Sequence, residues 1–256
     1  LILGIGCSTT HVGGAGAASA SGVRFLDRAD RELKPGGGAL AELDRIDLSG
    51  LSHLLVRADI LIACDVDNPL TGERGASAVF GPQKGATPEM VLQLDAALSR
   101  YAEVATEVTG KNIAALPGAG AAGGLGAGLL FFTGAKLRPG VELVLETLPF
   151  AEQIPDVDLV LTGEGASDYQ TAFGKAPVGV AMAAKKYKKP VICISGALGS
   201  GVEALYDKGI DGLSGAVCSV ISLEDCMVKA ADLLERAVER VMRVYCLGMR
   251  HGNGRI

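Results

Sequence analysis

The stretch LVLTGEGASDYQTAFGKAPVGVAMAAKKYKKPVICIS, residues 159–195, decides the fold class. It begins with an apolar run at 159–162 and passes through a glycine-rich turn. A segment of helical composition follows at 175–186, and a second apolar run follows at 191–195. A strand, a helix and a strand at this spacing predict two parallel strands joined by a crossover helix. The sequence therefore predicts an α/β fold built on a parallel sheet.

The residues that follow this stretch continue the alternation. They predict a helix at 202–208, a third strand at 215–221, a long amphipathic helix at 223–245 and a frayed tail at 250–256. Polar residues and prolines at 148–156 separate this part of the chain from the part before it. We therefore predict two domains, residues 1–155 and residues 156–256.

The first of these domains contains the same kinds of element, interrupted by glycine-rich turns. An apolar run at the start leads into the glycine-rich turn 6–16, an arrangement that is typical of anion sites. Apolar residues at 54–56 and 60–64 predict a buried strand that ends at acidic residues. A helix is predicted at 89–109. The glycine tract 117–128 predicts either a loop or a helix packed closely against another element.

Composition excludes several classes of protein. Hydrophobic residues make up 48% of the 256 residues, so the chain is globular rather than disordered. The net charge is −5, and no basic stripe with interleaved aromatics indicates nucleic-acid binding. No apolar run is long and unbroken enough to predict a membrane helix. No CxxC pair indicates zinc, so we expect reduced cytosolic thiols at Cys7, Cys64, Cys193, Cys218, Cys226 and Cys246.

The turn after the strand at 159–162 is the strongest candidate for chemistry. Gly163 and Gly165 flank Glu164 where the strand ends, and these positions could present amides to an anion. Candidates for binding substrate or phosphate follow at Gln170, Thr171 and Lys175, and Glu164 and Asp168 could hold Mg²⁺ or accept a hydroxyl proton. The GxxxxGK[ST] phosphate loop is absent from the sequence. A tight turn with surface charges is the plainer alternative.

A second group of candidates lies in the first domain. Asp65 and Asp67 come just after a predicted strand, where two carboxylates could bind hydrated Mg²⁺ or supply a base. An Asx-turn pair before Pro69 is the alternative. Lys84 could face an anion or simply be solvated, and Ser8 in the first glycine-rich turn is a further binding candidate. The three histidines, His11, His53 and His251, lie at no catalytic spacing and are expected to be non-catalytic.

Several long blocks, in this order, resemble the bacterial glycerate kinase family from the start of the chain to about residue 234. The clearest is ACDVDNPLTGERGASAVFGPQKGATPEM at 63–90, and the others are 117–128, LRPG at 137–140, TGEG at 162–165 and GKAP at 174–177. The resemblance implies a cytoplasmic enzyme of the glycerate 2-kinase type. That enzyme would use ATP and Mg²⁺ to convert glycerate to phosphoglycerate.

The resemblance also implies an architecture. It implies two α/β domains with the site in the cleft between them. The C-terminal domain would be part of a Rossmann- or flavodoxin-like parallel sheet with helices on both faces. The family completes that sheet with an N-terminal segment that carries an Asp-Ser-Phe-Lys loop, and we expect the present chain to be unstable or inactive without it. The sequence does not decide between a monomer and a homo-oligomer.

Two departures from the family pattern bear on activity. The first loop of the family usually reads GGSATNDGG, whereas His11 and Val12 stand here in place of Asn and Asp. After Gly165 the family usually has Arg-Ile-Asp, whereas this chain has Ala166, Ser167 and Asp168. A catalytically degenerate protein that binds a small acid or a nucleotide is therefore the alternative function.

The leading hypothesis is a glycerate kinase with assigned roles. Asp65, Asp67 and Asp168 are the candidate acids, and Asp65 and Asp67 are also the candidate Mg²⁺ ligands. Lys84, Glu164 and Lys175 would position phosphate or carboxylate groups. A Rossmann-type oxidoreductase is the third hypothesis, and it would need a GxGxxG motif between a strand and a helix, with an acidic residue about 20 positions further on.

Overall fold

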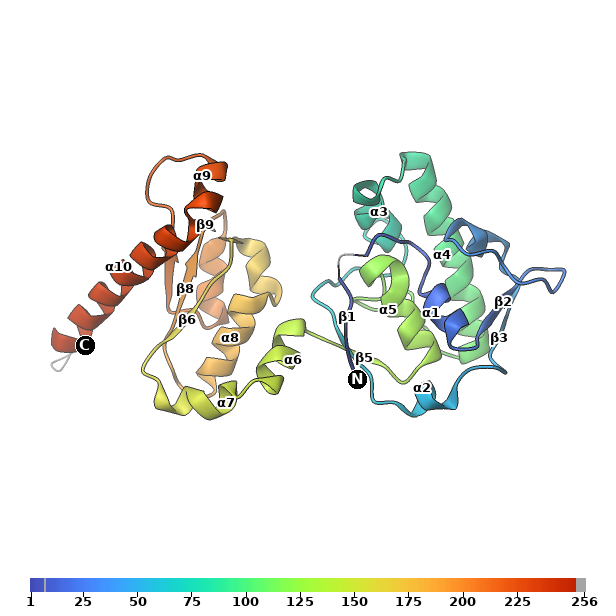
Figure 1. Cartoon of the computed structure of the whole chain (residues 1–256), viewed down its shortest axis with the longest axis horizontal. Coiled ribbons are helices and arrows are strands. Elements are labelled where there is room, and N and C mark those ends of the chain that lie inside the picture. Colours follow the sequence, from blue (N-terminus) through green and yellow to red (C-terminus); the bar gives the residue numbers. More distant parts are fainter. Residues whose placement is uncertain (7, 252–256) are drawn as a thin grey trace. The chain divides into compact units, whose positions relative to one another are not determined.

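A computed structural model describes residues 1–6 and 8–251 of the chain. Its contacts group the residues into two compact units, Leu1–Gly140 and Val141–Ile256 (Figure 1). Helices α6 (Gly140–Thr147) and α7 (Phe150–Gln153) precede the boundary predicted at residue 155, and apart from Gly140 their residues are grouped with the second unit. Cys7 and the tail 252–256, for which a thiol and a frayed end were predicted, lie outside the described residues.

The first unit contains a parallel sheet and an antiparallel pair of strands. The parallel sheet has the order β1 (Ile2–Gly4), β4 (Leu61–Ala63), β5 (Lys136–Arg138), and the antiparallel pair is β2 (Arg24–Leu26) with β3 (Arg45–Asp47). The helices are α1 (Ala15–Ala20), η1 (Gly38–Glu42), α2 (His53–Arg57), α3 (Ala76–Phe80), η2 (Pro82–Lys84), α4 (Pro88–Thr109) and α5 (Ala121–Phe132).

Helix α4 organises the core of this unit, and its ends follow from the sequence. Thr87 caps the start by accepting a hydrogen bond from the Met90 amide, Pro88 takes the first helical position, and Gly110 ends the helix in the left-handed conformation. The buried face carries Tyr101, whose ring packs edge-on against Phe131 of α5. This aromatic cluster gives the first unit a closed core.

The glycine tract 117–128 is both a turn and a helix. Backbone angles turn left-handed at Ala122, Gly123 and Gly124, where α5 begins with a kink. A Cβ atom on Gly123 would lie 1.9 Å from the carbonyl oxygen of Thr10, so the tract packs directly against the first glycine-rich turn. Only glycine permits this approach.

The second unit contains the parallel sheet predicted from residues 159–195. Strands β6 (Val160–Thr162), β8 (Val191–Ser195) and β10 (Gly212–Gly215) run parallel in the order β10-β8-β6, and β7 (Ala166–Ser167) pairs with β9 (Ala197–Leu198). The helical elements are η3 (Ile154–Asp156), η4 (Tyr169–Phe173), α8 (Ala176–Lys185), η5 (Val202–Lys208), α9 (Leu223–Val228) and α10 (Ala230–His251).

Helices cover both faces of this sheet, as the alternation of side chains along β8 shows. Val191 and Cys193 pack in the core that α8 supplies. Ile192 and Ile194 point the other way and pack with residues of α10. Both faces of β8 are therefore covered, which explains its continuous apolar sequence. Together the two units form a mixed α/β fold with parallel sheets.

Three predicted elements are wrong in type or position. Residues 54–56 form part of helix α2 rather than a strand, and Leu54 is 81% exposed rather than buried. The third strand is Gly212–Gly215 instead of 215–221, because its four residues pair with Ile192–Ser195, where β8 ends. The single helix predicted at 223–245 is divided between α9 and α10 at Lys229.

No helix among the described residues is long and apolar enough to cross a membrane. The five described cysteines, at positions 64, 193, 218, 226 and 246, are free thiols.

Candidate functional site

Asp65 lies just beyond the end of strand β4 and is held by a backbone amide. One carboxylate oxygen, Oδ1, accepts a hydrogen bond from the Gly140 amide at 2.7 Å. A Cβ atom on Gly140 would lie 3.0 Å from the carboxylate, so glycine at this position avoids a close contact with Asp65. The Asp65 side chain is exposed, and its second oxygen is left for a ligand or a proton.

Asp67 has a different partner from Asp65. Its carboxylate forms an ion pair with the Arg74 guanidinium at 2.9 Å, and both side chains are about 70% exposed. Exposed pairs of this kind stabilise a fold by less than about 1 kcal/mol. Arg74 is also fixed through its carbonyl, which accepts from the Asn68 amide group at 2.8 Å. The two aspartates predicted to act together therefore bind separate groups, and Asp67 already has a cation beside it.

The first glycine-rich turn is cross-linked by side chains. Lys84 donates from Nζ to the Thr10 carbonyl at 3.1 Å, and Ser8 Oγ lies 3.3 Å from the same oxygen. His11 is buried, and its Nε2 is 2.8 Å from the Ala76 carbonyl. Burial lowers the pKa of His11, and the nearby Lys84 charge lowers it further. His11 therefore links the loop to α3. Lys84 and Ser8 thus contact the same carbonyl oxygen, and their role in binding an anion stays a prediction.

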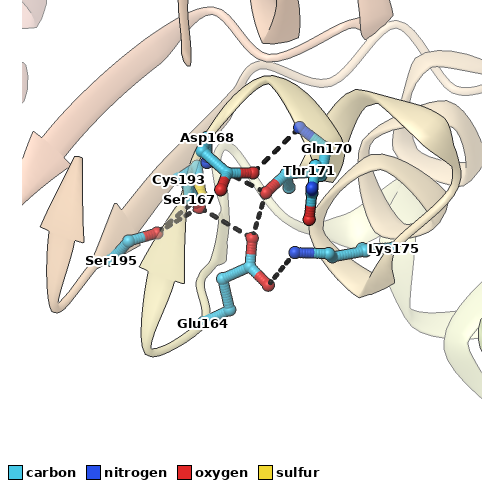
Figure 2. Close-up of polar contacts among 8 residues, drawn as sticks. All are labelled: Glu164, Ser167, Asp168, Gln170, Thr171, Lys175, Cys193 and Ser195. Atoms are coloured by element: carbon cyan, nitrogen blue, oxygen red, sulfur yellow. Dashed lines mark hydrogen bonds and ion pairs between the residues drawn. The ribbon is translucent and has the colours of Figure 1, made fainter. Parts of the chain in front are cut away.

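The second unit gathers its candidates around Glu164 (Figure 2). Oxygen Oε1 of Glu164 accepts hydrogen bonds from the Ser167 hydroxyl at 2.9 Å and from the Thr171 hydroxyl at 2.6 Å. The other oxygen, Oε2, lies 3.9 Å from the Lys175 ammonium group. The Glu164 side chain is 20% exposed and that of Lys175 is 42% exposed. A fixed carboxylate therefore lies beside an accessible cation.

Asp168 begins the short helix η4 and has a structural role there. Its carboxylate accepts from the Gln170 amide at 2.8 Å, while its own amide donates to the Thr171 hydroxyl at 3.1 Å. This capping box fixes the turn that carries Thr171. The Gln170 side chain is exposed and donates to the Tyr169 hydroxyl at 3.2 Å.

One of the two glycines of this turn, Gly163, has a packing reason as well as a candidate binding role. A Cβ atom on Gly163 would lie 2.0 Å from the Ile194 carbonyl oxygen, so β6 can end beside β8 only with glycine there. Gly165 has open space around its Cα. The amide of Gly196 donates to the Glu164 carbonyl at 3.0 Å, which keeps the turn against the end of β8.

A groove opens beside Glu164 at the ends of strands β6 and β8. Its volume is about 610 Å³, and apolar residues of α9 and α10 line its far side, among them Met227 and Leu234. Gly163, Glu164 and Gly165 form its polar end. Ligands of parallel α/β sheets bind at the carboxyl ends of the strands, which is where this groove lies.

Three buried residues of this site were not predicted as site residues. Ser167, Cys193 and Ser195 are fully buried next to Glu164. In the sequence, Ser167 stands out only as a departure from a family pattern and Cys193 only as an expected reduced thiol. One signal was available: alternation along a strand places Cys193 and Ser195 on the same face, with Ser195 at the end where ligands bind.

The carboxylates fit Mg²⁺ as partial ligands. Among residues 1–6 and 8–251, no group of three or more His, Cys, Asp or Glu side chains could hold a metal ion. Mg²⁺ is usually bound by one or two carboxylates together with water and phosphate, so a three-ligand cluster is not required. Asp65 leaves one oxygen for such a ligand, whereas the second oxygen of Glu164 is shared with the Lys175 ammonium group 3.9 Å away. Asp67 fits less well, because Arg74 pairs with it.

These features define an α/β protein that presents carboxylates just beyond the ends of parallel strands, the edge at which such sheets bind their ligands. Comparison with known proteins identifies the family. Residues 1–246 match the profile described as the glycerate kinase family. The chain belongs to that family.

Individual relatives agree with this assignment. The chain is 51% identical over 241 residues to the glycerate kinase of Halalkalibacterium halodurans, which covers 94% of this chain and 63% of the relative. It is 45% identical over 251 residues to the glycerate 2-kinase of Escherichia coli, covering 98% of this chain and 66% of the relative. The chain thus spans just under two thirds of the length of these relatives.

A solved structure has the same fold. The crystal structure of a Salmonella typhimurium LT2 protein described as glycerate kinase 2 is 44% identical and superposes with a TM-score of 0.79. The match covers 97% of this chain and 65% of that one.

Proposed function

We propose that the protein with this chain is a glycerate kinase, which transfers the γ-phosphoryl group of ATP to a hydroxyl of glycerate and releases phosphoglycerate and ADP. The observation that carries the proposal is the Glu164–Lys175 pair beside the groove at the strand ends, in a chain of the glycerate kinase family. Phosphoryl transfer requires positioning and charge neutralisation more than covalent chemistry, and this pair offers both signs of charge.

Five of the candidate residues have a role in this proposal. Lys175 stands at the N-cap of the ten-residue helix α8, where its charge and the helix N-terminus would bind a phosphate or the glycerate carboxylate. Glu164 would orient Lys175 and the substrate. Asp65 would accept the hydroxyl proton on its exposed oxygen, and Lys84 with Ser8 would bind an anion at the first glycine-rich turn.

Mg²⁺ held by Asp65 or Glu164 together with ATP would neutralise charge on the transferred phosphoryl group. The same proposal includes two finer assignments. The second unit is part of a Rossmann- or flavodoxin-like parallel sheet, and the enzyme is cytoplasmic.

A coupled assay of the full-length protein with Mg-ATP and D-glycerate tests the proposal. We expect formation of ADP and phosphoglycerate that depends on both substrates and stops when EDTA removes the metal. Phosphorus NMR of the product identifies the hydroxyl that was phosphorylated. Absence of phosphoglycerate under these conditions would falsify the proposed activity.

The second candidate function is a protein that binds a small acid or a nucleotide without turnover. The observations that favour it are the burial of His11 against α3 and the pairing of Asp67 with Arg74, which leave neither side chain free for catalysis. Titration calorimetry with ATP and with glycerate distinguishes the two. Binding of either ligand without product formation supports this second candidate.

A further inference from the structure

Three buried polar side chains form a continuous chain that ends at Glu164 (Figure 2). The sulfur of Cys193 lies 3.4 Å from the hydroxyl oxygen of Ser195, which lies 2.6 Å from that of Ser167. Ser167 in turn donates to Glu164 Oε1 at 2.9 Å. Cys193, Ser195 and Ser167 are each 0% exposed. Glu164 therefore has a row of polar groups behind it that reaches into the core of the second unit.

The direction of these hydrogen bonds follows from the number of protons. A serine hydroxyl has one proton to donate, and a carboxylate can only accept. Ser167 uses its proton on Glu164, so its oxygen must accept the proton of Ser195. Ser195 has then no second proton, so the thiol of Cys193 is a donor, either to Ser195 at 3.4 Å or to Ser167 at 3.8 Å. All donors in the chain point toward Glu164, an arrangement in which each bond polarises the next.

This row of hydrogen bonds ends on one oxygen of the Glu164 carboxylate only. Oε1 of Glu164 accepts from both Ser167 and Thr171, and the Thr171 hydroxyl is itself fixed because it accepts from the Asp168 amide. A carboxylate with two buried donors on one oxygen cannot rotate without breaking both bonds. The second oxygen, Oε2, is thereby kept on the side of Lys175.

We propose that Ser167 is a positioning residue, aligned by Ser195, that holds Glu164 so that Oε2 orients Lys175 for phosphoryl transfer. The catalytic consequence rests on the proposed kinase function, whereas the orientation of Glu164 does not. Burying hydroxyl groups is costly unless they are paired, and an apolar residue would fill the space as well. The three polar groups lie where they can act on the one carboxylate beside the groove.

Matched serine-to-alanine variants of the full-length protein test the kinetic effect. Ser167→Ala removes a donor to the carboxylate, and we expect kcat to fall about 10-fold or more with KM changed less than about 2-fold. Ser195→Ala leaves the Ser167 hydroxyl in place but unaligned, and kcat should fall about 3-fold. Ser77→Ala is the control: Ser77 is equally buried, its hydroxyl has no hydrogen-bond partner among the described residues, and kcat should stay at the wild-type value.

Crystal structures of the same variants give a readout that does not depend on activity. We expect Glu164 to occupy one conformer in the wild type and in Ser77→Ala, and more than one in Ser167→Ala. Ser195→Ala serves in place of Ser167→Ala if the latter does not fold. If the wild type phosphorylates no glycerate, the kinase proposal fails and the Glu164 conformers alone decide the positioning proposal. A single, unchanged Glu164 conformer, or a kcat that falls no further than in Ser77→Ala, overturns it.

Discussion

The two units hold their acidic residues in opposite ways. In the first unit, Asp65 and Asp67 are exposed, and each is fixed by one group at the surface, a backbone amide and an arginine. In the second unit, the hydroxyls of Ser167 and Thr171 both donate to Glu164, and Ser167 is itself hydrogen-bonded to the buried Ser195. The comparison indicates that Glu164 is oriented before any ligand binds, whereas Asp65 and Asp67 keep the freedom to adjust to one.

Removing the preorganised carboxylate should have the largest effect. Glu164→Gln keeps the shape but loses the charge that faces Lys175, and we expect kcat/KM for glycerate phosphorylation to fall roughly 100-fold. Steady-state kinetics with Mg-ATP measures this. Glu203→Gln, at an exposed glutamate of the same unit, is the control and should behave as the wild type. Equal activity of the two variants would remove Glu164 from the site.

Substitutions of the two aspartates of the first unit should lower kcat by different amounts. Asp65→Asn removes a carboxylate whose second oxygen is available, and we expect kcat to fall about 30-fold. Asp67→Asn removes a charge that Arg74 already neutralises, and we expect a change of less than about 3-fold. Both variants are compared in the same assay. Equal losses would show that Asp67 acts with Asp65 despite its arginine.

Thr171 links Glu164 to the cap of η4, and removing its hydroxyl should lower the free energy of unfolding. Thr171→Val leaves the Asp168 amide and one oxygen of Glu164 without their shared partner. We expect the free energy of unfolding to fall by about 1–3 kcal/mol. Urea denaturation followed by circular dichroism measures the change. Ser77→Ala removes an unpaired hydroxyl and should leave the unfolding curve nearly unchanged, and a loss as small in Thr171→Val would contradict this account of the network.

The buried histidine of the first unit predicts a smaller, pH-dependent effect. Burial lowers the pKa of His11 below its ordinary value of 6.5, so the unfolded chain binds a proton more readily than the folded one. The resulting stability is fully present above pH 6.5 and falls as the pH drops below it. Urea denaturation at pH 7.5 and pH 5 should show this loss in the wild type, and a smaller loss in His11→Asn.

The exposed His53 provides the control for this titration. His53→Asn should retain the full difference in stability between the two pH values. If His11→Asn and His53→Asn keep the same difference, the titrating group lies elsewhere in the protein.

Local patterns in the sequence were sufficient for much of the fold. The apolar periodicity of residues 89–109 predicts α4, which spans Pro88–Thr109, and the continuous apolar run 191–195 predicts β8, both faces of which are buried. The strand predicted at residues 54–56 was wrong because a short apolar run alone does not distinguish a helix from a strand. The third strand was predicted at the wrong residues because its register depends on where β8 ends. That pairing belongs to the tertiary structure and is not encoded in the local sequence.

The candidate site was only partly visible in the sequence, for a related reason. Glu164, Thr171 and Lys175 lie within one turn and the helix that follows it, so sequence proximity brought them together. Ser167 and Ser195 lie far apart in sequence and meet because their segments lie side by side in the fold, which no local pattern predicts. Whether Asp67 is free or paired with Arg74 likewise depends on the path of an irregular loop.

Two glycines, Gly123 and Gly179, differ in what obstructs a side chain, and suppressor genetics should detect this difference. At Gly123 the obstacle is the main chain, the carbonyl oxygen of Thr10, so no second-site replacement can make room for alanine. At Gly179 the obstacle is the side chain of Val141, whose Cγ1 atom would lie 2.4 Å from the added carbon. A selection for folded protein should therefore recover Gly179→Ala together with Val141→Ala, and should return only glycine at position 123.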